Sequence, residues 1–206
     1  MRFSKLGDLY ENELFAPAER RYWFFQLLVW LDVLAPEIPK CVIETGTNLG
    51  YGAYTWSMFF DEVHTVELSE HQYNKAKDVY GLVNNITFYN DTSDSFLAEI
   101  LPTRTDQCII FLDAHGSGGD TTFDDRDGRF GSPILRELQM IKEHSTRNDH
   151  IILIDYLEDC VKLPGYPNKD EIREALKDIN PEYHIELDFP SHLMMSVGGV
   201  GMSIVL

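Results

Sequence analysis

The sequence predicts an α/β protein with a mostly parallel sheet covered by helices on both faces, and three observations lead to this fold class. Short strand-like runs alternate with helical stretches between residues 41 and 179. Two of these runs, Cys108–Asp113 and His150–Asp155, are almost entirely apolar, as strands buried on both faces are. The runs Tyr183–Phe189 and Gly199–Leu206 leave no room for a helix between them, so we expect an antiparallel pair there.

Each expected element rests on a local pattern. Residues 17–34 carry apolar side chains at helical spacing, and Pro36 follows them, so we expect a helix that ends near residue 34. The apolar face of this helix is expected to pack in the core, with a homodimer surface as the alternative; it carries Trp23, Phe24, Phe25 and Trp30. The expected strands are 41–44, 63–67, 85–89, 108–113, 150–155, 183–189 and 199–206, and the later helices are 54–60, 70–80, 95–101, 133–144 and 169–179.

Length and charge limit the classes of protein. With 206 residues, of which 44% are apolar, the chain is expected to form one domain over 1–206, a helical segment 1–39 followed by an α/β core 40–206. The start of the chain lacks a signal-peptide pattern, and its longest apolar region is too short to cross a membrane, so we expect a cytoplasmic protein. The net charge of −17 disfavours nucleic acid and membrane surfaces as partners and favours a small ligand or a divalent metal.

The cysteines give no sequence signal for a metal or a disulfide framework. Cys41, Cys108 and Cys160 are an odd number, and no pair of them has CxxC spacing. Two of them lie beside apolar runs, where buried free thiols are the expected interpretation. The sequence therefore disfavours a zinc site.

Four of the predicted strands end at an acidic residue, namely Glu44, Glu67, Asp113 and Asp155. In parallel α/β sheets, ligands bind outside the carboxyl ends of the strands, so these acids are expected to surround one site. After Glu44 comes a Gly-rich turn with GxxxGxG spacing, which differs from the GxGxxG of dinucleotide folds. Glu67, 21 residues after Gly46, could accept hydrogen bonds from a ribose. The alternative is a plain strand–helix turn with a surface glutamate.

These residues carry a resemblance. The run from Glu44 to Ala53, the strand 63–67 with its Glu67, the Asn90–Ser93 segment, Phe111-Leu-Asp113 and Leu153-Ile-Asp155 resemble class I S-adenosylmethionine-dependent methyltransferases, particularly the catechol O-methyltransferase type and the metal-dependent sugar O-methyltransferases. The resemblance implies a Rossmann-like seven-stranded sheet with a C-terminal antiparallel strand pair. It also implies that S-adenosylmethionine contacts Glu44, Gly46, Thr47, Asn48, Gly50, Glu67, Leu68, Asp91, Thr92 and Asp113.

Within that set, Glu44 and Gly46 would lie near the methionine end of the cofactor, and Glu67 would hold the ribose. Asp91 and Thr92 would face the adenine, although Asp91 could equally serve as a helix N-cap. A carboxylate-lined pocket also suits a sulfonium cation, and acceptor oxygens suit a ribose diol and an adenine amino group.

Asp113 and Asp155 match the strand-end acids that bind the metal in the resembling enzymes, and two such acids suit Mg²⁺. At the next position, Tyr156 stands where those enzymes have Asn or Asp, so one ligand is missing and metal binding is an open question. Because of this departure, a catalytically inactive module that binds S-adenosylmethionine is the alternative to an enzyme.

His115, two residues after Asp113, is the candidate general base, because a neutral imidazole can take a proton from a hydroxyl; a structural histidine is the alternative. Asp113 and His115 are thus the predicted catalytic residues. The loop Gly116–Gly131 is either a lid or a solvated surface loop. The leading hypothesis is O-methylation of a small-molecule acceptor such as a sugar hydroxyl, and the less favoured enzyme is a NAD-dependent oxidoreductase.

Overall fold

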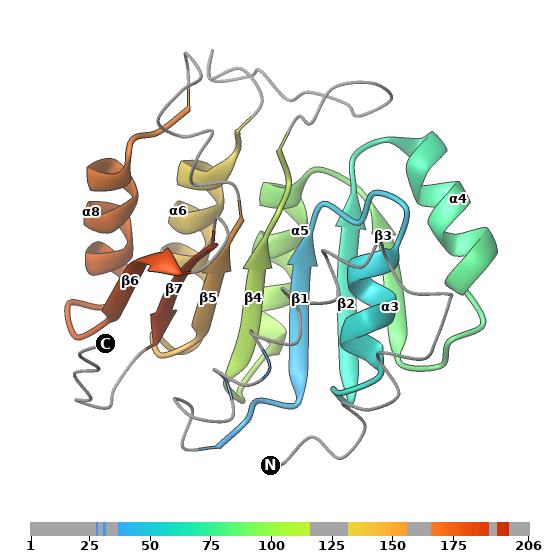
Figure 1. Ribbon diagram of the computed structural model, residues 1–206, viewed down its shortest axis with the longest axis horizontal. Helices are drawn as coiled ribbons and strands as arrows, with labels where there is room; N and C mark the ends of the chain where they lie inside the picture. Colours follow the sequence, from blue (N-terminus) through green and yellow to red (C-terminus); the bar gives the residue numbers. More distant parts are fainter. Residues whose placement is uncertain are drawn as a thin grey trace.

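A seven-stranded sheet forms the centre of the protein in this computed structural model, which describes residues 28, 31, 37–115, 132–155, 166–189 and 193–197. The strand order is β3-β2-β1-β4-β5-β7-β6 (Figure 1). The strands are β1 Cys41–Thr45, β2 Glu62–Glu67, β3 Ile86–Asn90, β4 Cys108–Leu112, β5 Ile151–Ile154, β6 His184–Phe189 and β7 Leu193–Val197. The helices are α3 Tyr51–Ser57, α4 Glu70–Tyr80, α5 Ser93–Ile100, α6 Ile134–His144 and α8 Lys169–Ile179, with a short 3-10 helix at Leu101–Thr103.

The predicted α/β class with a parallel central sheet is confirmed. Strand β1 lies between β2 and β4 and pairs with both in parallel, and the parallel pairing continues outward to β3 and β5. From β1 the chain continues to β2 and β3 on one side of the sheet. It then returns from β3 to β4, which lies on the other side of β1, so the direction of strand addition reverses at β1. The carboxyl ends of the five parallel strands therefore share one edge, at the top of Figure 1. At the far side, β7 pairs antiparallel with both β5 and β6.

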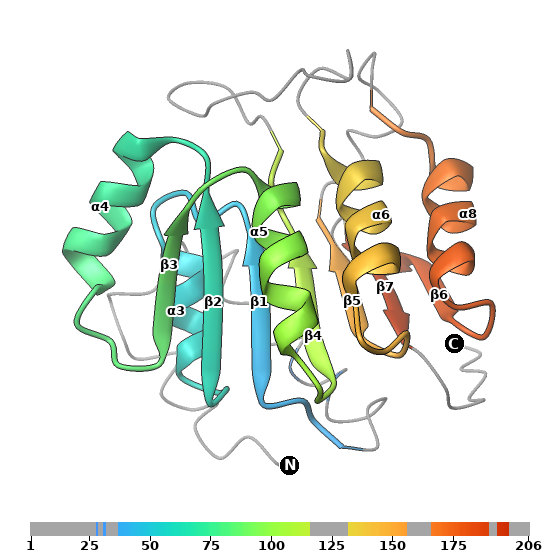
Figure 2. The same cartoon turned by 180° about the vertical axis from the view of Figure 1, so that it is seen from behind.

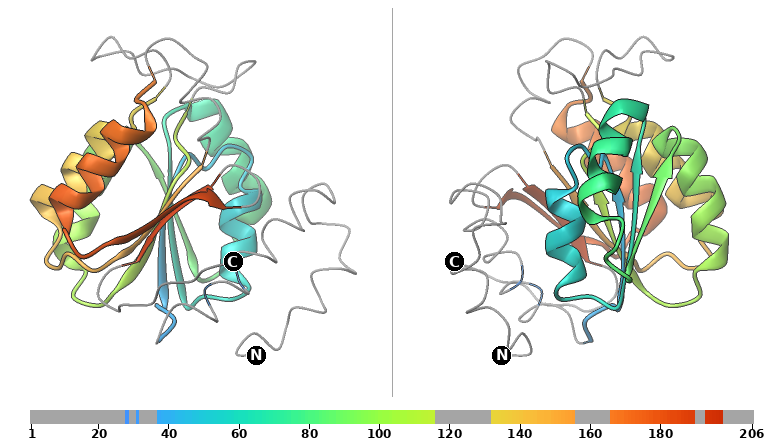
Figure 3. Two further views of the ribbon diagram at one scale, coloured as in Figure 1. Left: turned by 60° about the vertical axis from the view of Figure 1, so that its left-hand side comes forward. Right: turned by 90° about the vertical axis from the view of Figure 1, so that its right-hand side faces the viewer.

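Helices cover both faces of the sheet. Helices α3 and α4 lie on one face, whereas α5, α6 and α8 lie on the other (Figures 1 and 2), and the two views of Figure 3 show the sheet between them. Each face has its own core, because alternate residues of the strands point to opposite sides. Trp56 and Ile109 belong to the core on the α3 face, and Ile43 and Ile110 to the core beneath α5 and α6.

Of the predicted N-terminal helix, only Leu28 and Leu31 are among the described residues. Both are helical, and both are buried in the core on the α3 face. This agrees with the expectation that the apolar face packs in the core, at least for these two leucines. The remaining residues of 17–34, including those considered for a homodimer surface, lie outside the described residues.

Several boundaries differ from the sequence prediction. Helix α3 begins at Tyr51 rather than at residue 54, because Gly50 takes a left-handed conformation (φ 82°) and forms its N-cap. The N-cap of α5 is Thr92, whose hydroxyl accepts from the Ser95 N–H, so Asp91 is not the cap. The partner of β6 is the strand at 193–197, and the expected strand at 199–206 lies outside the described residues. Within the described ranges, no helix is both long and apolar enough to cross a membrane.

Candidate active site at the carboxyl edge of the sheet

The Gly-rich turn after β1 lies directly against the ends of β2 and β4. The backbone N–H groups of Gly46 and Thr47 both donate to the Val66 carbonyl oxygen, at 2.9 and 3.0 Å. Gly46 has a φ of 86°, and a Cβ atom on it would lie 2.4 Å from the Asp113 carbonyl oxygen. Only glycine allows this backbone conformation and this approach. The turn that was predicted to receive a ligand is therefore also the point where the segments after β1 and β4 meet.

Glu67, at the end of β2, is fixed by two backbone donors. Its Oε2 accepts from the Asn48 N–H at 2.7 Å, and its Oε1 accepts from the Ser69 N–H at 2.9 Å. The side-chain amide of Asn90 donates to the Glu67 carbonyl oxygen at 2.8 Å and to that of Leu68 at 3.4 Å. The carboxylate thus has a fixed orientation beside the Gly-rich turn. Because a carboxylate has about four acceptor positions, it can still accept hydroxyl groups of a ligand.

Glu44, at the end of β1, is buried rather than lining an open surface. Its exposed fraction is 2%, and its Oε2 accepts from the Thr65 hydroxyl at 2.7 Å. Its other oxygen lies beneath the first turn of α3, because a Cβ on Gly52 would approach Oε1 to 2.3 Å. Burial raises the pKa of Glu44 to about 8, and the nearby Asp113 adds to the rise, while the Thr65 hydroxyl opposes it.

This raised pKa makes stability depend on pH. Between the ordinary value of 4.5 and about 8, the folded protein holds a proton on Glu44 that the unfolded chain releases. The free energy of unfolding should therefore fall as pH rises through this range, by up to about 1.4 kcal/mol per pH unit from this group. Chemical denaturation from pH 5 to 9 should show a flatter profile for E44Q than for the unsubstituted chain. The exposed-site control E70Q should keep the original profile; equal slopes for E44Q and E70Q would contradict the assignment.

Asp113, His115 and Asp155 come together beyond the ends of β4 and β5. One ligand atom from each lies within 4.8 Å of the others. His115 Nε2 lies 2.9 Å from Asp113 Oδ1, and the His115 side chain is only 8% exposed whereas that of Asp113 is 28% exposed. The Asp113 N–H donates to the Thr45 carbonyl oxygen at 3.1 Å, which fixes this segment to the end of β1. Two carboxylates and an imidazole in this arrangement can bind a divalent cation or hold and transfer a proton.

The remaining predicted site residues are distributed around this edge. Asp91 is exposed, and its Oδ1 accepts from the Thr92 N–H at 2.7 Å. It follows β3, which β2 and β1 separate from the β4 strand that precedes Asp113. Thr47 is buried, and its hydroxyl lies 2.6 Å from that of Thr65. Tyr156 and the loop 116–131 lie outside the described residues, so the predictions about a missing metal ligand and a lid stay predictions.

Sequence reasoning missed Glu137, which lies on α6 below the same edge. Its side chain is fully buried, and burial raises its pKa to about 7, although the Ser93 and Thr45 hydroxyls oppose the rise. A signal was available, because Glu137 occupies the apolar stripe of its helix between Ile134 and Leu138. A charged residue on such a stripe indicates either a satisfied buried group or a functional one.

The fold and these residues together describe an α/β protein with a candidate ligand site where β1 and β4 lie side by side. No family model matches the chain, and no curated protein matches it. Several solved structures match the chain. An O-methyltransferase from Bacillus cereus in complex with SAH is 15% identical, with 95% of this chain and 90% of that chain covered and a TM-score of 0.57. A SAM-dependent methyltransferase from Aquifex aeolicus is also 15% identical, with 93% and 96% covered and a TM-score of 0.55. The chain has the fold of these methyltransferases.

Proposed function

We propose that the protein is an S-adenosylmethionine-dependent methyltransferase that transfers the methyl group to a hydroxyl of a small-molecule acceptor, such as a sugar. The observation that carries the proposal is the meeting of the Gly46 turn, the fixed Glu67 carboxylate and the Asp113–His115 pair at one edge of the sheet. The fold shared with methyltransferases, one of them bound to SAH, supports the same assignment.

The chain's own groups fit the cofactor. Glu67 would accept the ribose hydroxyls, and the close approach of Gly46 to the Asp113 backbone holds the turn beside the end of β4, where the cofactor would bind. Asp91 and Thr92 after β3 would contact the adenine end. Asp113 and Glu67 give the site a negative field that stabilises a sulfonium cation, whereas the buried Glu44 is protonated at neutral pH. S-adenosylmethionine, when bound, supplies an electrophilic methyl carbon.

His115 and Asp113 would handle the acceptor proton. A neutral His115 that donates its Nε2–H to Asp113 Oδ1 has Nδ1 as its basic atom, and this nitrogen is buried, so the acceptor hydroxyl would have to reach it inside the protein. His115 would take up the proton that the acceptor hydroxyl loses when its oxygen receives the methyl group. Asp113 stabilises the imidazolium that results. Most of the remaining rate enhancement would come from holding the acceptor oxygen in line behind the methyl carbon.

The same cluster fits a divalent metal. Asp113 and Asp155 offer the hard carboxylate oxygens that Mg²⁺ prefers, and His115, bonded to Asp113, would orient its ligand as an outer partner. Mg²⁺, when bound, would lower the pKa of an acceptor hydroxyl. The acceptor is proposed to be neutral or cationic, because the chain carries a net charge of −17.

A calorimetric titration with S-adenosylmethionine and SAH tests the cofactor assignment. The unsubstituted chain should bind both, and E67A should weaken both by about 10- to 100-fold, because it removes the ribose acceptor and leaves two backbone donors unsatisfied. The control E70Q, an exposed acid three residues later, should bind like the unsubstituted chain. The absence of binding by the unsubstituted chain would refute the proposed function.

A further inference from the structure

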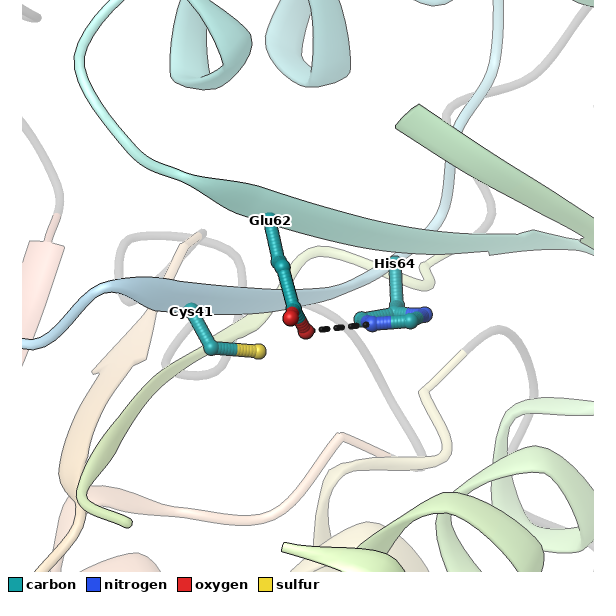
Figure 4. Close-up of side chains that lie close together, drawn as sticks. All are labelled: Cys41, Glu62 and His64. Atoms are coloured by element: carbon teal, nitrogen blue, oxygen red, sulfur yellow. Dashed lines mark hydrogen bonds and ion pairs between the residues drawn. The ribbon is translucent and has the colours of Figure 1, made fainter. Parts of the chain in front are cut away.

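A second group of metal-ligating side chains lies at the opposite, amino edge of the sheet. Cys41 is the first residue of β1, and Glu62 and His64 lie at the start of β2 (Figure 4). One ligand atom from each of the three lies within 4.8 Å of the others. These residues take no part in the site described above, because the Gly-rich turn and the acidic strand ends are at the other end of the same strands.

Strand pairing brings the three side chains onto one face. Cys41 and Glu62 are register partners across β1 and β2, and His64 is two residues beyond Glu62 on the same strand. Since strand side chains alternate with a period of two, all three point to the same face of the sheet. Cys41 belongs to the core on the α5 side, and Figure 4 shows the thiol and the imidazole on either side of the Glu62 carboxylate.

One distance within the group is compatible with two ligands of a tetrahedral ion. Two ligands about 2.0–2.1 Å from a tetrahedral zinc ion lie about 3.4 Å apart. His64 Nε2 and Glu62 Oε2 are 3.4 Å apart. The Glu62 side chain is 57% exposed and that of His64 is 11% exposed, so an ion can enter from solvent on the Glu62 side and keep a water ligand there.

Outer contacts already orient two of these side chains. His64 Nδ1 lies 3.2 Å from the Tyr89 hydroxyl, which leaves Nε2 to face the group. Arg104 Nη1 donates at 2.7 Å to Glu62 Oε2, the same oxygen that faces His64 Nε2, so an ion would bind the free Oε1 or replace Arg104 at Oε2. Bound metals usually have ligands oriented by such second partners, a histidine through its other ring nitrogen and a carboxylate through a hydrogen bond.

The protonation states also suit a cation. Burial lowers the pKa of His64, which favours the neutral imidazole that coordinates metals. A Cys41 thiolate and the Glu62 carboxylate would supply two negative charges to the ion, and Arg104 already pairs with the carboxylate.

We propose that Cys41, Glu62 and His64 form a binding site for zinc or another thiophilic divalent ion, which joins β1 to β2 at the amino edge of the sheet. Sulfur, nitrogen and oxygen ligands together are typical of zinc and unlike the oxygen-rich sites of Mg²⁺. This site is independent of the proposed methyltransferase function, because no residue is shared between the two.

Cobalt titration of the full, phosphine-reduced chain tests the proposal, with Co²⁺ as a spectroscopic probe. One equivalent should produce a sulfur-to-cobalt charge-transfer absorption, and one equivalent of Zn²⁺ should remove it. The variant C41S should abolish this absorption. H64Q should weaken Co²⁺ binding by about 100-fold or more, beyond the usual effect of an outer partner. H71Q changes an exposed histidine on α4, and it should bind Co²⁺ like the unsubstituted chain.

Further variants separate this site from other thiols and from loss of folding. C160S and C108S should keep the charge-transfer absorption. E62A removes the ion pair with Arg104, so without metal it should stay folded but melt slightly below the unsubstituted chain, and it should bind Co²⁺ at least about 10-fold more weakly. No charge-transfer absorption in the unsubstituted chain, or its persistence in C41S, would overturn the proposal. So would unchanged Co²⁺ affinity in E62A.

Discussion

Replacing His115 with Gln should lower the rate of methyl transfer by about 10²- to 10⁴-fold, the contribution typical of a general base. Glutamine can still donate to Asp113 from its amide nitrogen, but it cannot take up the acceptor proton. The affinity for SAH should change little, because the contacts of Glu67 and of the Gly46 turn are untouched. Single-turnover rates with a hydroxylated acceptor, together with calorimetric titration of SAH, measure the two quantities separately.

Two comparisons make that result interpretable. H71Q, on the exposed surface of α4, should keep the rate of the unsubstituted chain. D113N should also lose most of the rate, because an amide can neither stabilise the imidazolium nor supply an anionic metal ligand. A rate for H115Q within a few-fold of the original would remove His115 from the mechanism. If SAH binds but no acceptor is methylated by the unsubstituted chain, the inactive binding module becomes the better description.

Replacing Gly46 with Ala should have the largest effect on both stability and cofactor binding. A side chain at a φ of 86° costs about 1–3 kcal/mol in backbone strain alone. In addition, the new Cβ would lie 2.4 Å from the Asp113 carbonyl oxygen and 2.9 Å from the Ala114 nitrogen, both backbone atoms. The segments after β1 and β4 would therefore have to separate, and we expect a total loss of about 3 kcal/mol or more.

Denaturant unfolding without ligand measures the stability part of this prediction, and SAH titration of the folded fraction measures the binding part. The two should fall together in G46A, because one displacement disturbs the turn that holds Glu67 and the segment that carries Asp113. A variant of unchanged stability that binds SAH normally would show that the close approach at Gly46 is not required.

The order of strands and helices was predictable because it depends on local patterns. Apolar runs such as Cys108–Leu112 identify central strands by themselves, and acids placed just after such runs must gather at one edge of a parallel sheet. That reasoning is sufficient to bring Asp113 and Asp155 together, as the structure does. The depth of Glu44 was not predictable, since it depends on how α3 packs over the end of β1.

Cross-strand register was the main structural feature that could not be predicted from the sequence. Cys41 and Glu62 are 21 positions apart in the chain, and only the pairing of β1 with β2 makes them neighbours. A search for cysteines in CxxC spacing cannot find such a group. The N-cap of α5 was also not predictable from sequence. Asp91 and Thr92 are both good capping residues, and which of them caps the helix depends on where β3 ends.

The central position of β1 has a consequence for synthesis of the chain on the ribosome. Cys41 pairs with Cys108, which is 67 positions later (108 − 41), so one edge of β1 must wait for β4. At 5–20 residues per second, that wait is roughly 3 to 13 s. During this time β1, β2 and β3 can already pair, and β1 would present to other chains an open edge whose five residues are all buried in the folded protein. Nascent chains of this protein should therefore need chaperone protection most while residues 46 to 112 are being made.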